Sequence, residues 1–226
     1  MLTAAEQTAV EQLRKSEAGM GRAIVALLLD RDGERARAEL CTQEERSRRY
    51  FERALPPVPG RFGFSPCDGA ILAACDVLCH APVDRRLKPL ALVFDPAVTN
   101  ADWSGCPPSA VDPALALVAW IMDDMSRCGR HLIRSRPEGI VDRVLTEVTS
   151  LLFRNRGSDV GGALARLGPE YAAAMADGLW RSDPYAFVHV SVLAALEIGV
   201  ERGLLDLSQL ADTVPYVPLW FLRRDG

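Results

Sequence analysis

The sequence predicts an all-α protein, with a multi-helix, bundle-like body and an N-terminal helical hairpin packed on it. Three observations support this prediction: apolar residues recur at helical spacing, prolines fall between the periodic segments, and there is no clear series of alternating strands. The chain has 226 residues, of which 49% are hydrophobic, and this is enough to build a core. The alternative is an α+β fold, which requires strands at 23–29 or 90–94.

The N-terminal hairpin is predicted from two segments without proline. Thr3 and Glu6 have the spacing of a capping box, and a long first helix is expected over 3–29. Residues 30–33 then form a turn. A charged helix is expected over 34–55, because Pro56 and Pro57 stop it.

A connector rich in proline and glycine at 56–66 is the one candidate domain boundary. It divides the hairpin at 1–55 from a main helical body at 67–226, although 1–226 as one domain remains an alternative. A long loop at 94–112 is interpreted either as a binding loop or lid, or as a packed surface loop anchored by Trp103.

The main body is predicted to contain a succession of helices. An acidic cap at Asp112 with Pro113 in the first turn indicates a helix over 113–135. Further helices are expected at 137–153, which has an apolar stripe, and at 158–167, 169–180 and 184–204, the last capped by Ser182 or Asp183.

Composition excludes several classes of function. A net charge of −4 and a pI near 5.5 argue against nucleic acid as a partner. Only Lys15 and Lys88 are lysine among 26 basic residues, and this bias is typical of bacterial-type, high-arginine composition. No export signal opens the chain and no apolar stretch reaches the length of a membrane span, so we expect a cytoplasmic protein without a membrane partner.

Six cysteines are expected to be free thiols in a reducing compartment. Cys75, Cys79 and His80 suggest a zinc site by residue type, but no second cysteine or histidine pair follows at a matching spacing. Core packing is therefore the preferred interpretation, and no cofactor is expected.

Asp123 and Asp124 stand next to Arg127, Arg130 and His131 in the densest polar cluster of a predicted helix. The acidic pair resembles the start of the magnesium-binding motif of class I isoprenoid synthases, and this resemblance covers two residues. It implies a Mg²⁺ site with arginines holding a diphosphate. The family's next acid is replaced by Arg127, and no second motif occurs. The alternative is an ion pair between Asp123 and Arg127 on a solvated face.

His189 and Glu197 are candidate catalytic residues, because their helix is apolar on nearly every side and burial can tune such groups for acid–base chemistry. They are eight residues apart, roughly 12 Å along a helix, which is too far for a direct bond. The alternative for His189 is a hydrogen-bonded structural histidine.

Two features favour binding to a protein. Arg127, Arg130 and Arg134 form a stripe with Trp120 beside it, and residues 214–222 contain Tyr216 and Trp220, side chains that are enriched at interfaces. The alternative for the arginine stripe is that it is merely a solvated face, and the alternative for the tail is that it folds back onto its own helices.

These features predict a non-enzymatic interaction, regulatory or adaptor protein that binds a protein partner or a second copy of itself, forming an oligomer. The alternative is a small helical enzyme or ligand-binding protein that acts on a phosphorylated or otherwise anionic small molecule, with Mg²⁺ as its candidate ion.

Overall fold

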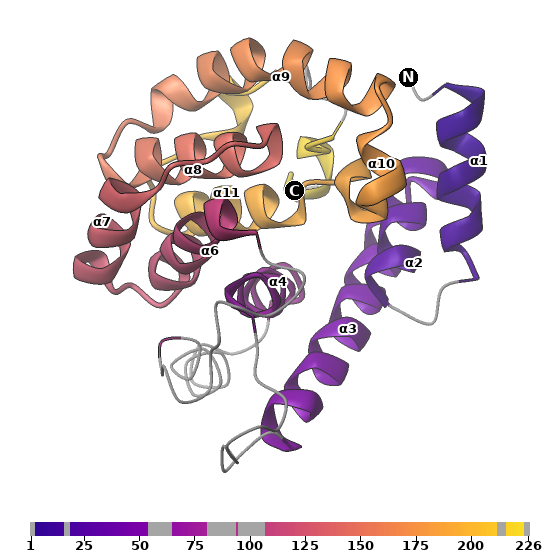
Figure 1. Ribbon diagram of the computed structural model, residues 1–226, viewed down its shortest axis with the longest axis horizontal. Helices are drawn as coiled ribbons and strands as arrows, with labels where there is room; N and C mark the ends of the chain where they lie inside the picture. The colour runs from indigo at the N-terminus through magenta and orange to yellow at the C-terminus, as the bar shows by residue number, and fades with distance from the viewer. Residues whose placement is uncertain are drawn as a thin grey trace.

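The computed structural model describes residues 3–15, 19–53, 65–80, 94, 107–211 and 216–223. Within these ranges the chain forms helices and no β-strand, so the all-α prediction is confirmed. Residues 23–29 are helical, which contradicts the α+β alternative there. Figure 1 shows the helices of residues 4–53 on one side of the molecule and those of residues 108–153 on the other, with helix α4 (Pro66–Leu78) between them.

The first helix is shorter than predicted. The capping box of Thr3 and Glu6 is present and starts α1 (Ala4–Leu13). The predicted single helix over 3–29 is wrong, since a separate helix, α2 (Gly19–Val25), follows. The two helices have different surroundings: α1 is mostly exposed, whereas nearly every residue of α2 is buried.

Close packing of α2 on the next helix explains a glycine that no pattern singled out. A Cβ at Gly19 would lie 2.3 Å from the backbone oxygen of Glu39 in α3 (Gly33–Arg53). Only glycine permits this approach. The charged helix predicted at 34–55 is confirmed as α3 within the described residues.

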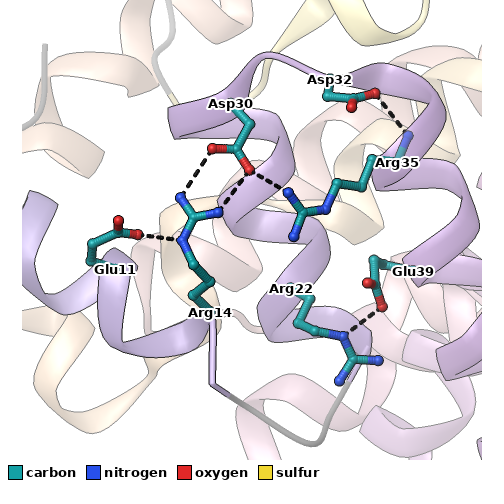
Figure 2. A network of polar contacts seen from close by, with 7 residues as sticks. All are labelled: Glu11, Arg14, Arg22, Asp30, Asp32, Arg35 and Glu39. Carbon is teal, nitrogen blue, oxygen red and sulfur yellow. Dashed lines mark hydrogen bonds and ion pairs between the residues drawn. The ribbon is translucent and has the colours of Figure 1, made fainter.

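A π-helical turn, η1 (Ala26–Asp30), joins α2 to α3 and ends at Arg31, whose φ is 50°. Figure 2 shows the ion pairs that surround this turn. Both terminal nitrogens of Arg14 contact Asp30, at 3.0 and 3.1 Å, and Arg35 contacts the same carboxylate at 2.9 Å. The hydrogen bond from Arg14 lowers the pKa of Asp30. The network therefore ties α1 to α3 through the π turn.

Helix α4 (Pro66–Leu78) begins with a second capping box, formed by Ser65 and Asp68. Most of the connector predicted at 56–66 lies outside the described residues, and its last two residues start this helix. Helix α4 is buried almost throughout and packs against α3, α6 and α11.

The helix predicted over 113–135 is two helices. Helix α6 (Pro108–Ile121) starts at the Pro107–Pro108 pair. The proline that marks the start of the helix is therefore Pro108, and Pro113 lies inside the helix. The chain then turns at Asp123, whose φ is 62°, and α7 (Met125–Arg134) packs back against α6. The loop predicted at 94–112 lies mostly outside the described residues, Trp103 included.

Helix α8 (Ile140–Phe153) confirms the predicted stripe, since Val144, Val148 and Leu152 are buried. The helices predicted at 158–167 and 169–180 are largely one, α9 (Val160–Ala176), and Pro169 lies within it. A proline nitrogen has no hydrogen to donate, yet the flanking turns continue the helix. A short helix, α10 (Leu179–Ser182), follows.

The helix predicted at 184–204 begins later than expected. A 3-10 turn, η4 (Pro184–Phe187), precedes α11 (Val190–Glu201). The backbone N–H of His189 donates to the carbonyl of Tyr216 at 2.8 Å, so the C-terminal segment fixes the start of α11. Helix α11 packs against α4, α6 and α8.

Two further observations complete the fold. Cys67 is disulfide-bonded, so the expectation of free thiols is wrong at this position, whereas Cys41, Cys75, Cys79 and Cys128 are free. No helix in the described part of the chain is both long and apolar enough to cross a membrane.

Candidate functional site on helix α7

Helix α7 is held against the body by one face. Asp124 caps its start by accepting a hydrogen bond from the backbone N–H of Arg127 at 2.9 Å. Cys128 is buried, and a Cβ at Gly129 would meet the Phe153 ring of α8 at 3.0 Å. Figure 1 shows α7 at the edge of the molecule, beside α6 and α8. Its opposite face is therefore exposed.

This exposed face carries an apolar side chain. Ile133 is 75% exposed and Met125 is 38% exposed, and they are the large hydrophobic residues found exposed in the described part of the chain. Burying an isoleucine is worth about 1.5–3 kcal/mol, so an exposed one leaves this free energy available to a contact. The exposure of Ile133 could have been predicted from the sequence, because this residue lies outside the apolar stripe of its helix. The predicted site did not include it.

The three predicted arginines lie on the same helix as this isoleucine and make exposed contacts. Arg127 lies 3.2 Å from Asp124, with its guanidinium 4.8 Å from the Phe94 ring centre. Arg134 lies 3.8 Å from Asp112, and Arg130 donates to the Ser126 hydroxyl. Exposed pairs of this kind are worth about 0–1 kcal/mol, so they can be exchanged for contacts with a partner.

Trp120 does not belong to this face, contrary to the sequence-based prediction. Its side chain is 1% exposed, and the guanidinium of Arg202 covers its ring at 4.2 Å. The turn at Asp123 causes the difference, because it ends α6 before the arginines begin.

A histidine–carboxylate pair lies at the side of α7. The Nδ1 atom of His131 is 2.8 Å from an oxygen of Asp112, and the Phe94 ring stacks beside the imidazole. A carboxylate that accepts from Nδ1 leaves Nε2 as a proton acceptor. Sequence reasoning placed His131 next to the arginines but did not connect it with Asp112, because the predicted helix began at that residue.

Asp123 and Asp124, the predicted magnesium ligands, serve different partners. Asp124 caps α7, whereas Asp123 lies 3.1 Å from Arg202, which follows α11. Their carboxylates therefore do not form a pair directed at one ion, and the resemblance to the isoprenoid synthases gains no support from the geometry.

His189 and Glu197 lie at opposite ends of α11 and are not brought together. His189 is buried between helices, with its Nε2 2.8 Å from the carbonyl of Val141. Burial lowers the pKa of this imidazole to about 4, so it is neutral near pH 7 and donates a structural hydrogen bond. Glu197 is also buried and lies near His80 instead.

Tyr216 and Trp220, the predicted interface aromatics, belong to a tail that folds back onto the helices. Tyr216 is 7% exposed and stacks on Tyr171 at 4.7 Å. Trp220 is half-buried against the core. The described part of the tail therefore contributes to the core.

Cys75 in α4 and Cys79, which caps the end of this helix, do not share a site with His80. Cys75 is fully buried, and burial raises the pKa of the Cys79 thiol to about 12. His80 follows the helix with a φ of 55° and contacts Arg37 at 2.9 Å. These thiols remain protonated near neutral pH, which agrees with the packing role predicted for them.

Comparisons of the chain with protein-family models, with curated proteins and with solved structures found no match. Function is therefore inferred from the side chains themselves.

Proposed function

We propose that the protein is a non-enzymatic interaction protein, and that the exposed face of α7 binds a second copy of the chain. The observation that carries this proposal is Ile133, which is 75% exposed and has Arg130 and Arg134 within one turn of it. Arginine is enriched at protein interfaces, and an exposed apolar side chain gains free energy when a partner buries it.

The distribution of charge favours the same chain as the partner. The chain has 26 basic and 30 acidic residues, and 125–136 contains four of the arginines and no acidic residue. The rest of the chain therefore has a net charge of −8. Each copy offers a basic segment and an acidic remainder, which attract each other between copies.

This distribution also limits the geometry of the pair. Two α7 helices face to face would place like charges together, so α7 of one copy contacts an acidic surface of the other. A two-fold axis then repeats this contact twice, as is usual in closed dimers.

Reversing the charge of the face tests the proposal. The variant R130E/R134E is expected to be monomeric by light scattering after size-exclusion chromatography, under conditions in which the wild type forms a dimer. The matched control is R49E/R154E, which changes the net charge equally at two exposed arginines outside α7. A control variant that also dissociates, or a wild type that is monomeric throughout, contradicts the proposal.

A second candidate function is supported by a cleft between α8 and α9. The cleft has a volume of about 400 Å³, and its lining includes Arg143, Arg154 and Arg166, together with Thr146 and Ser150. Arginines and hydroxyls are typical donors to a phosphorylated small molecule. Arg143 and Arg166 already pair with Glu170 and Glu147, which lowers the charge available to such a ligand.

A thermal-shift screen separates the two functions. If the cleft binds phosphorylated metabolites, they raise the melting temperature of the wild type and leave that of an R154E variant unchanged. The absence of any shift contradicts the ligand-binding function and leaves the interaction proposal unaffected.

A further inference from the structure

Three side chains from distant parts of the sequence meet beside α11. His80 follows α4, and Glu197 and Glu201 lie one helical turn apart on α11. One potential ligand atom from each of the three lies within 4.8 Å of the others. Among the described residues, this is the one such group of three.

The spacing is close to what a tetrahedral metal ion requires. A zinc ion with bonds of about 2.1 Å holds its ligand atoms about 3.4 Å apart. The Nδ1 atom of His80 is already 3.8 Å from a carboxylate oxygen of Glu197. Side-chain rotation of Glu201, which is exposed, supplies the remaining movement.

The surroundings hold one of the ligands in place. Glu197 is 2% exposed on a helix that packs against three others, so its carboxylate has little freedom to turn away. A fixed carboxylate lowers the entropic cost of binding an ion. On the other side of the His80 ring, Nη1 of Arg37 lies 2.9 Å from Nε2.

The contact between Arg37 and His80 competes with metal binding. When Arg37 donates to Nε2, the imidazole carries its proton on Nδ1, at the position where a metal would bind. Metal binding therefore requires the other tautomer, and Arg37 must give up this contact. The guanidinium keeps its hydrogen bonds to the carbonyls of Leu78 and Phe221, so the rearrangement is local.

We propose that His80, Glu197 and Glu201 form a binding site for a divalent transition-metal ion such as zinc. One imidazole and two carboxylates match the nitrogen and oxygen ligands of zinc. Three protein ligands leave a fourth position for water. The site is on the α4–α11 side of the molecule and is independent of the α7 face.

Calorimetric titration of the untagged protein, with the disulfide of Cys67 intact, tests the site with zinc. We expect one ion to bind per chain, and His80→Asn or Glu201→Gln to weaken binding by at least about tenfold. Asparagine tolerates the positive φ at position 80 and Glu201 is exposed, and circular dichroism of each variant checks that the helical fold is retained. The matched control is His131→Asn, which should bind zinc like the wild type.

Substitution with cobalt identifies the ligands. Nitrogen and oxygen ligation predicts weak visible bands without the intense near-ultraviolet band of a thiolate–cobalt bond. A thiolate band shows that cysteines hold the ion and overturns the proposal. So does the absence of zinc binding, or unchanged binding in His80→Asn.

Discussion

Arginine has opposite roles at the α3–α4 contact and on α7. At the α3–α4 contact, Arg48 is 11% exposed and pairs with two buried carboxylates, those of Glu44 and Asp76. On α7, Arg134 is 71% exposed and its carboxylate partner is 3.8 Å away. The sequence shows arginines at helical spacing in both helices.

The difference is one of burial and pairing. A buried guanidinium must keep its partners, because an unpaired charge is costly in a low-dielectric interior. An exposed guanidinium can exchange its partner for another molecule at little cost. Arg48 therefore contributes to the fold, whereas Arg134 is available for binding, and the predictions below test this distinction.

The largest effect is expected at the α3–α4 contact. Arg48→Ala leaves the carboxylates of Glu44 and Asp76 without this cation and is expected to lower the free energy of unfolding by about 3–5 kcal/mol. Urea unfolding followed by circular dichroism measures this loss. The adjacent Arg49, which is 71% exposed, supplies the control, because Arg49→Ala should change stability by less than about 0.5 kcal/mol. Equal losses of unfolding free energy in Arg48→Ala and Arg49→Ala would contradict the distinction between buried and exposed arginines.

Buried His189 predicts a dependence of stability on pH. Its pKa is about 4 in the folded protein and is near 6.5 when exposed, so the unfolded chain binds a proton first as the pH falls. The contribution of neutral His189 to the free energy of unfolding is fully present above about pH 6.5 and is lost between about pH 6.5 and about pH 4. This loss is on the order of 3 kcal/mol.

Urea unfolding as a function of pH tests this prediction, with His189→Gln as the comparison. Carboxylates titrate in both proteins, so the difference between the two pH profiles isolates the imidazole. Parallel profiles over this range would show that His189 is not held neutral by burial.

The ion pairs around the π turn (Figure 2) are intermediate in burial between those at the α3–α4 contact and those on α7, since the Asp30 side chain is 25% exposed. Asp30→Asn removes the charge that Arg14 and Arg35 share, and should lower stability by about 1 kcal/mol. Added salt should reduce the difference from the wild type, because these charges are near the surface. A loss as large as that of Arg48→Ala would mean that the network behaves as a buried one.

The smallest effect on stability is expected at the exposed isoleucine. Ile133→Ser should change the free energy of unfolding of the monomer by less than about 0.5 kcal/mol, because Ile133 is 75% exposed. The same change should weaken self-association, since it removes the apolar anchor. A clear loss of monomer stability would show that Ile133 packs within its own chain.

Local signals predicted several elements of the fold. The capping box at Thr3, the charged helix α3 and the apolar stripe of α8 depend on residues within a few positions of one another, and these predictions are confirmed. The start of α6 was misplaced because the same proline signal occurs at Pro108 and Pro113.

Long-range contacts were beyond prediction from the sequence. Arg202 covers Trp120 from 82 positions away, and the pairing of His80 with Glu197 joins α4 to α11. The break at Asp123 has no glycine to mark it, because aspartate can also adopt a positive φ. The arginines of the candidate site on α7 were singled out from the sequence, whereas the buried Trp120 was wrongly placed beside them and the exposed Ile133 was missed.

Sedimentation equilibrium of the wild-type protein tests the central claim, that α7 binds a second copy, most directly. At about 50 mM salt we expect a mass between those of a monomer and a dimer that rises with protein concentration. At about 500 mM salt, where charges are screened within a few ångströms, the mass should fall toward that of the 24.7 kDa monomer. A monomer mass at every concentration in low salt, or a dimer that salt does not affect, would contradict the account.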